Sequence, residues 1–190
     1  SLRRRQRQMC IRDRSGTVFL ARHLGLDEER AIKRVRRTES GFIQEAALLK
    51  RLRHPGIPII YDLEIDENYY YLIEEYLCGE SLYARIERTG SLQTGELIRL
   101  GIELCRIMNY LHSFKPNPIL YLDLHPGNLL ICREQLKLID FDQAALASLS
   151  QERSVCYGTK GFAAPEQYEG GTLDERTDIY AIGALLYYMG

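Results

Sequence analysis

The sequence lacks any hydrophobic run long enough to cross a membrane. Its longest nearly apolar stretch, residues 179–189, is much shorter than the roughly 20 residues that a transmembrane helix needs. The first residues also lack the pattern of a secretory signal peptide. We therefore expect a cytoplasmic location and no membrane contact from this segment, although a part of the protein outside this sequence could anchor it.

Paired cysteines and a strong charge imbalance are absent as well. The five cysteines are scattered without a C-x-x-C pair, which indicates reduced thiols and argues against a zinc site. The formal net charge of −1 gives no reason to expect nucleic acid as a partner. With 190 residues, 45% hydrophobic and 27% charged, the chain has the composition of one globular domain or most of one.

The first fourteen residues differ from the rest because they carry six Arg against one Asp. Residues 4–14 read like the conceptual translation of a transposase sequencing adapter. We therefore predict that residues 1–14 are an artefact and exclude them from reasoning about the fold. The predictions that follow concern residues 15–190 alone.

A short turn between two apolar runs concentrates the reactive side chains. Asp123 precedes Asn128 in this turn, and Asp140 ends the next apolar stretch. We expect residues 129–132 and 136–139 to form a hairpin that returns Asp140 to the side of Asn128. One carboxylate can orient an attacking hydroxyl, while an amide oxygen and a second carboxylate hold Mg²⁺ on nucleotide phosphates. The pattern indicates phosphoryl transfer.

These residues resemble the protein kinase family. Asp123 and Asn128 match the H-R-D-L-x-x-x-N catalytic loop, and Asp140 and Phe141 begin like D-F-G. The resemblance implies that Asp123 orients the acceptor hydroxyl and that Asn128 and Asp140 bind the metal. It makes ATP and Mg²⁺ the expected cofactors.

The polar stretch 143–163 resembles a kinase activation segment. Residues 158–166 are close to the G-T-x-x-Y-x-A-P-E of Ser/Thr kinases. The resemblance implies that Thr159 contacts Asp123 and helps to shape the substrate site. It further implies that Asp178 caps the following helix and braces the backbone of the catalytic loop.

In the first half of the chain, apolar and polar residues alternate as they do in strands, and one stretch has the apolar spacing of a helix. We expect strands at residues 15–21, 31–35, 59–65 and 69–76, a hairpin turn at 26–30 and a helix at 38–53. Ala31 and Lys33 resemble the V-A-I-K strand, in which Lys33 would hold the nucleotide phosphates. A lone Lys is usually a solvated surface charge. Glu45, which falls within the predicted helix at 38–53, resembles the glutamate that pairs with this lysine in kinases.

The resemblance also implies a set of nucleotide-binding residues. Gly16 and Val18 match the end of the glycine-rich pattern G-x-G-x-x-G-x-V, although a strand glycine is more often a bulge. Backbone groups of Glu75 and Leu77 would bind adenine, with Glu74 at the gatekeeper position. The full expected set is Gly16, Val18, Ala31, Lys33, Glu75, Leu77 and Leu130.

The expected fold class is α+β, a bilobal protein-kinase-like fold. An antiparallel sheet with one helix would form the N-lobe at about 15–75. A helical C-lobe would follow at about 76–190, with a core helix at 96–114, and would end incomplete at the helix after residue 177. We expect the kinase domain to be truncated at both ends and the fragment by itself to be poorly active.

The resemblance implies ATP-dependent phosphorylation of Ser or Thr hydroxyls on protein substrates, as in a bacterial Ser/Thr kinase. Three departures keep alternatives open. Leu122 replaces an arginine that pairs with activation-loop phosphate, His125 replaces a lysine near the γ-phosphate, and Asp142 replaces the D-F-G glycine. One alternative is a nucleotide-binding pseudokinase. The other is a small-molecule kinase of the aminoglycoside or choline type.

Overall fold

The computed structural model forms two compact units. Unit 1 comprises Ser1–Arg53 and Pro58–Cys78, and unit 2 comprises His54–Ile57 and Gly79–Gly190. The residues that the structure describes are 2–3, 11–13, 16–37, 42–150 and 158–190. No helix within these ranges is long and apolar enough to cross a bilayer.

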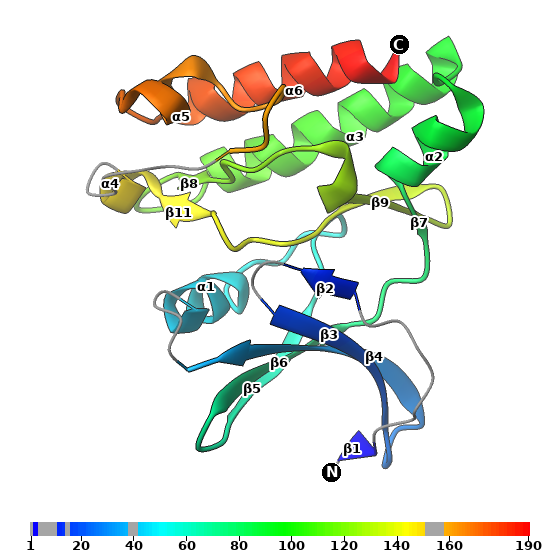
Figure 1. Cartoon of the computed structure of the whole chain (residues 1–190), viewed down its shortest axis with the longest axis vertical. Helices are drawn as coiled ribbons and strands as arrows, with labels where there is room; N and C mark the ends of the chain where they lie inside the picture. Colours follow the sequence, from blue (N-terminus) through cyan, green and yellow to red (C-terminus); the bar gives the residue numbers. More distant parts are fainter. Residues whose placement is uncertain (1, 4–10, 14–15, 38–41, 151–157) are drawn as a thin grey trace. The chain divides into compact units, whose positions relative to one another are not determined.

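Unit 1 is built on an antiparallel sheet (Figure 1). Its strands run in the order β1-β3-β4-β6-β5, and β2 also pairs with β3. The strand bounds are β1 Leu2–Arg3, β2 Ile11–Asp13, β3 Gly16–His23, β4 Glu28–Arg36, β5 Ile60–Ile65 and β6 Tyr69–Glu75. The four strands predicted from the alternating pattern are therefore present.

The turn between β3 and β4 lies earlier than predicted. It occupies residues 24–27, not 26–30, so that β4 begins at Glu28. The Asp27 N–H donates to the His23 carbonyl at 2.9 Å, and the Asp27 carboxylate pairs with Arg22. Asp27 adopts a φ of 55°, a left-handed conformation that Asp tolerates better than most residues. These local bonds place the turn at Asp27.

The helix of unit 1, α1, ends earlier than predicted. It is described over Phe42–Leu49 and ends at Leu49, not at Arg53; the predicted part at 38–41 lies outside the described part of the chain. After Leu49 the backbone bonds tighten to three-residue spacing, from Arg51 N–H to Leu48 and from Leu52 N–H to Leu49. The residue before Pro55 avoids the helical region, so the chain leaves the helix ahead of it.

Unit 2 is mainly helical with two small sheets (Figure 1). Its helices are α2 Leu82–Thr89, α3 Thr94–His112, α4 Ala147–Ser150, α5 Pro165–Glu169 and α6 Glu175–Met189, with a 3₁₀ turn, η1, at Pro126–Asn128. One sheet has the order β10-β9-β7, and the other pairs β11 with β8. The bounds are β7 Glu80–Ser81, β8 Ile119–Leu120, β9 Leu129–Cys132, β10 Gln135–Leu138 and β11 Ala145–Leu146. The predicted hairpin after Asn128 is confirmed as β9 and β10.

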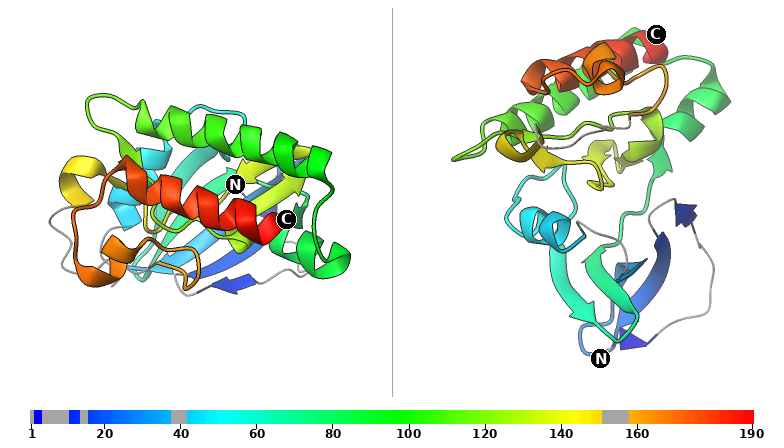
Figure 2. Two further views of the ribbon diagram at one scale, coloured as in Figure 1. Left: turned by 90° about the horizontal axis from the view of Figure 1, so that it is seen from above. Right: turned by 60° about the vertical axis from the view of Figure 1, so that its left-hand side comes forward.

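Helix α3 forms the centre of the unit 2 core, as its apolar spacing predicts. Its inward residues Leu100, Leu104, Ile107, Met108 and Leu111 are each no more than 1% exposed. Burying one such side chain contributes roughly 1.5–3 kcal/mol. Figure 2 shows α3, in green, beside α6, in red. The core therefore fixes α3 and α6, the two helices that support the loop between them in sequence.

The N-cap of α6 is Asp174 and not Asp178, so the predicted cap is wrong. The Asp174 carboxylate accepts a hydrogen bond from the Arg176 N–H at 2.9 Å, and the helix begins at Glu175. Asp178 falls in the first turn and is only 1% exposed. It is therefore placed to bond with other parts of unit 2.

Gly79 allows β7 to approach β9 closely. A Cβ at this position would lie 2.5 Å from the Ile131 carbonyl oxygen and 2.6 Å from Cys132 Sγ. A Cβ at Gly95, in α3, would meet no atom within 4 Å in the described part of the chain apart from its sequence neighbours and its own helix backbone. We predict that Gly79→Ala lowers the free energy of unfolding by about 1–3 kcal/mol through overpacking. Gly95→Ala should leave it unchanged or raise it by up to about 1 kcal/mol. Urea denaturation measures both, and equal stability of the two variants would contradict this account.

Candidate active site

The loop at residues 121–128, called here the Asp123 loop, is fixed by the buried carboxylate of Asp178. The backbone N–H groups of Tyr121 and Leu122 donate to Asp178 at 2.9 and 2.8 Å. His112 Nε2 lies 2.8 Å from Asp178 Oδ2. A buried carboxylate is stable only when donors surround it. The predicted bracing of this loop by Asp178 is therefore present, although Asp178 does not cap the helix.

Leu122 adopts a left-handed backbone conformation with a φ of 67°. Such a conformation costs a residue other than Gly roughly 1–2 kcal/mol. Its side chain is 3% exposed and belongs to an apolar cluster with Leu120 and Leu173. A strained residue persists when its surroundings determine its position from several sides. The strain thus lies directly before Asp123.

Three of the predicted site residues form one connected network. Thr159 Oγ1 donates to Asp123 Oδ1 at 2.8 Å, and Asn128 Nδ2 donates to the Asp123 carbonyl at 3.0 Å. The Asn128 carbonyl in turn accepts from the Ile139 N–H at 2.9 Å. The Asp123 loop is therefore bonded both to the segment containing Thr159 and to the residue before Asp140.

Tyr121 joins the start of the Asp123 loop to Asp140. Its hydroxyl donates to the carbonyls of Ile139 at 2.6 Å and Asp140 at 3.0 Å. Burial raises the pKa of Tyr121 well above its usual value, and the carboxylates of Asp140 and Asp123 raise it further. The hydroxyl therefore keeps the proton that both bonds require. The ring packs edge-on against Phe141 with centroids 5.2 Å apart.

The positive φ near this site belongs to Asp140 and not to Asp142. Asp140 has a φ of 59°, and Asp142 is not among the described non-glycine residues with positive φ. The Asp142 N–H lies 3.4 Å from Asp140 Oδ1. An aspartate at position 142 is therefore compatible with this backbone, and the strain lies at Asp140.

His125 is the residue that replaces the expected lysine. Its Nδ1 accepts from the Gly127 N–H at 3.1 Å, so the ring proton is on Nε2 and the ring is neutral in this arrangement. Nε2 lies 3.8 Å from Asp123 Oδ2, beyond a direct hydrogen bond. His125 therefore does not supply the fixed positive charge of a lysine.

The oxygen atoms of Asn128 and Asp140 are chemically suited to Mg²⁺. Mg²⁺ is commonly held by one or two carboxylates while nucleotide phosphates and water supply the other oxygens. Within the described ranges, no group of three or more His, Cys, Asp or Glu side chains could hold a metal by itself. The donor set fits a metal that arrives with a nucleotide better than a permanent structural ion.

Several predicted nucleotide-binding residues share one face of the unit 1 sheet. The register pairs Val18 with Lys33, and Leu20 with Ala31, so Val18, Ala31 and Lys33 point to the same side. Lys33 is only 7% exposed. The side chain of Glu45, in α1, lies outside the described part of the chain, so its predicted pairing with Lys33 stays a prediction.

Two of the other predicted nucleotide-binding residues, Gly16 and Glu75, already have structural roles within unit 1. A Cβ at Gly16 would lie 2.5 Å from the Arg34 carbonyl, so close approach of β3 and β4 already requires glycine there. The Glu75 N–H donates to the Ile59 carbonyl at 2.8 Å and is therefore engaged within unit 1. Leu77 follows β6, and Leu130 lies in β9 of unit 2. Their contacts with a nucleotide stay predictions.

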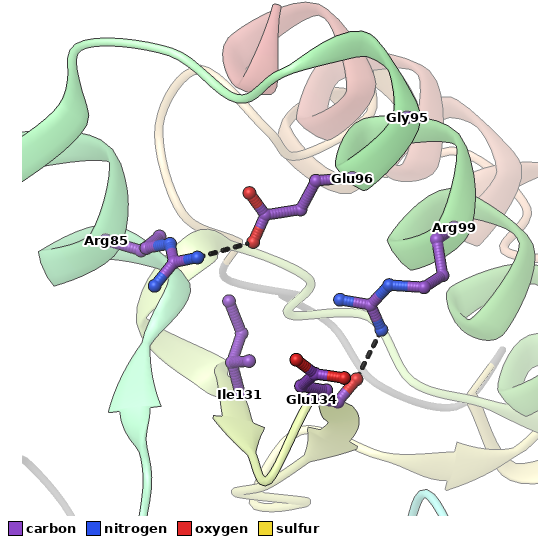
Figure 3. Close-up of a pocket in the computed structure, with 6 residues that line it drawn as sticks. All are labelled: Arg85, Gly95, Glu96, Arg99, Ile131 and Glu134. Carbon is purple, nitrogen blue, oxygen red and sulfur yellow. Dashed lines mark hydrogen bonds and ion pairs between the residues drawn. The ribbon is translucent and has the colours of Figure 1, made fainter.

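A pocket of about 550 Å³ in unit 2 contains none of these residues (Figure 3). It is lined by Arg85, Gly95, Glu96, Arg99, Ile131 and Glu134. Arg85 donates to Glu96 at 2.8 Å, and Arg99 donates to the Glu134 carbonyl. Because both arginines are bonded to acceptors within the pocket, it gives no reason to expect an anionic ligand there.

Comparison with known proteins assigns the chain to a family. The model of the protein kinase domain matches residues 13–190. The chain belongs to the protein kinase family. The α+β kinase fold expected from the sequence is thereby confirmed.

The relatives of this kinase chain include bacterial and plant proteins. It is 34% identical over 181 residues to serine/threonine-protein kinase PrkC of Bacillus subtilis, covering 90% of the chain and 27% of the relative. It is 28% identical over 194 residues to serine/threonine-protein kinase pkn3 of Myxococcus xanthus, covering 92% and 35%. It is 30% identical over 156 residues to integrin-linked protein kinase 1 of Arabidopsis thaliana, covering 78% and 33%. The chain thus spans about a third or less of the length of these relatives.

Sequence reasoning missed two residues that support the Asp123 loop, His112 and Gln167. His112 ends α3, and its ring nitrogen contacts the carboxylate that holds the Asp123 loop. Gln167 is 3% exposed and bonds to the Leu122 carbonyl. A polar residue two positions after Pro165 does fit a helix start, but a helix-start pattern does not reveal a partner 45 positions away.

We predict that Asp178→Ala destabilises the kinase fold far more than Asp174→Ala. Removing Asp178 leaves the buried N–H groups of Tyr121 and Leu122 unpaired, which should cost about 3–5 kcal/mol. Removing Asp174 deletes a partly exposed N-cap, which should cost about 1 kcal/mol. Chemical denaturation of both variants gives the comparison. Similar losses would show that Asp178 does not hold the loop.

Proposed function

We propose that the protein containing this chain transfers the γ-phosphoryl group of ATP to Ser or Thr hydroxyls of protein substrates. The observation that carries the proposal is the bond between Thr159 Oγ1 and Asp123 Oδ1, in a loop that also orients Asn128. Relatives that are named serine/threonine-protein kinases support the acceptor class. We further propose that the reaction takes place in the cytoplasm.

Asp123 is the group that would orient the acceptor hydroxyl. Its Oδ1 already accepts from Thr159, and its side chain is 25% exposed, so Oδ2 is the oxygen placed to accept from a substrate. Such positioning accounts for much of the rate in phosphoryl transfer, because the enzyme supplies little covalent chemistry. Asp123 is thus the proposed catalytic residue.

Asn128 and Asp140 would hold Mg²⁺, and Lys33 would bind the nucleotide phosphates. Bound Mg²⁺ supplies neutralisation of the charge on the transferring phosphoryl group. The protein contributes a loop whose backbone is fixed by Asp178 and Tyr121 before substrate arrives. Gly16, Val18, Ala31, Glu75, Leu77 and Leu130 complete the proposed nucleotide site, and Glu45 the proposed partner of Lys33.

A nucleotide-binding pseudokinase is the second candidate. It is favoured by His125, whose neutral ring does not provide the charge of the expected lysine. A small-molecule kinase is less favoured, because residues 158–166 match the segment that distinguishes Ser/Thr protein kinases. An assay with radiolabelled ATP separates the three functions. Transfer of label to a generic basic protein indicates a protein kinase, transfer to small hydroxylated acceptors indicates a small-molecule kinase, and transfer to neither indicates a pseudokinase.

We predict that Asp123→Asn in the complete protein abolishes phosphoryl transfer and leaves nucleotide affinity within about twofold. The amide keeps the size of the carboxylate but cannot accept the substrate proton, and a loss of at least about 100-fold in kcat is expected. Phosphate incorporation and nucleotide titration measure the two effects.

Asp174→Asn is the matched control for this experiment. It makes the same chemical change at an N-cap, where Asn serves as well as Asp. Normal activity in this control would assign the loss to position 123. Full activity of Asp123→Asn would remove Asp123 from its proposed role.

We predict that Thr159→Val reduces kcat by roughly 10-fold and that Thr159→Ser retains most of it. Valine keeps the shape of threonine but removes the hydroxyl that donates to Asp123 Oδ1. Loss of one orienting hydrogen bond at a catalytic carboxylate is worth roughly 1–2 kcal/mol. Steady-state kinetics at saturating ATP tests this, and equal rates for the Val and Ser variants would count against it.

A further inference from the structure

Gln167 spans two segments with the two ends of one buried amide. Its Nε2 donates to the Leu122 carbonyl at 2.8 Å, and its Oε1 accepts from the Ala164 N–H at 3.0 Å. The residue is 3% exposed. The orientation of the amide is determined by its partners, because the opposite orientation would place two oxygens and two N–H groups against each other.

The carbonyl that Gln167 contacts belongs to the strained residue before Asp123. Asp178 holds the Leu122 N–H, and Gln167 holds the Leu122 carbonyl, so both peptide groups of this residue are fixed by buried side chains. Two neighbouring helices, α6 and α5, supply them. Rotation about the Leu122 backbone would break one of these bonds and move Asp123.

Gln167 also lies beside the residue before Thr159. A Cβ at Gly158 would approach Gln167 Nε2 to 2.9 Å, so the backbone of Gly158 packs directly against the amide. Thr159 and Asp123 bond to each other through their side chains. The same amide therefore contacts the residues that precede both members of this pair.

A purely local role would leave half of these contacts unexplained. Gln167 is the third residue of α5, and its bond to Ala164 satisfies the N–H at the start of that helix. Ala164 has no side chain that could return a bond, so capping uses only Oε1. The Nε2 bond to Leu122 joins residues 45 positions apart and adds nothing to the helix.

We propose that Gln167 is a positioning residue that holds Asp123 in register with Thr159; this inference rests on the proposed function. Leu122 carries no charge that could pair with a phosphate. Besides the bond between Thr159 and Asp123, the Asp123 loop is joined to residues 158–167 through the neutral amide of Gln167, whose hydrogen bonds require no phosphate group.

The test compares Gln167→Glu and Gln167→Met with Asp174→Ala in the complete protein. At neutral pH, glutamate keeps the length and the Oε1 acceptor but loses the donor to Leu122, and methionine loses both. Asp174→Ala removes an N-cap in α6 and touches neither segment. Kinetics are measured well below the lowest melting temperature of the set.

We expect both Gln167 variants to lose about 10-fold or more in kcat, with the KM for ATP changed less than about twofold, because a misplaced catalytic group affects the rate more than nucleotide binding. Asp174→Ala should lower the melting temperature but keep kcat within about twofold. Wild-type kcat in both Gln167 variants would overturn the inference and leave Gln167 as a helix cap.

Hydrogen exchange at residues 121–124 separates failure of the inference from failure of the proposed function. If the wild-type protein transfers no phosphate, the proposed function fails. In that case, faster exchange of this segment in Gln167→Met than in Asp174→Ala still supports the positioning role. Equal exchange in the two variants overturns it.

Discussion

The Asp178 carboxylate is the interaction on which the rest of the site depends. It is buried in the first turn of α6 and receives two backbone N–H groups from the Asp123 loop and a ring nitrogen from His112. A loop of this kind has no regular partner strand for these N–H groups, and leaving them unpaired in the core would be costly. The core helices α3 and α6 thus determine the backbone from which the candidate catalytic side chains extend.

That backbone is strained at two positions, Leu122 and Asp140. Each has a φ that residues other than Gly rarely adopt, and each is held by a buried polar side chain: Gln167 on the Leu122 carbonyl and Tyr121 on the Asp140 carbonyl. Local strain is retained when surrounding contacts outweigh it. Both residues lie next to or within the proposed metal and acceptor site.

Several polar groups that act beside the Asp178 carboxylate are neutral. Tyr121 keeps its proton because its pKa is raised, Gln167 and Asn128 are amides, and the His125 ring accepts a backbone bond at Nδ1. Neutral hydrogen bonds respond little to salt or to moderate changes in pH. These neutral hydrogen bonds supplement those of the Asp178 carboxylate in holding the Asp123 loop.

Much of the fold and the site followed from local sequence. Alternating and helical spacing predicted the strands of unit 1 and helix α3, because burial of one face imposes that periodicity. The order of Asp123, Asn128 and Asp140 marked the candidate site, since phosphoryl transfer needs those groups, and the resemblance to kinases added Thr159. Tertiary structure alone decided which of two aspartates caps α6 and which holds the loop, because both fit a helix start and only packing buries Asp178. It also decided the role of Gln167 and the strain at Leu122, since a bond between distant backbone and side-chain groups leaves no periodic trace in the sequence.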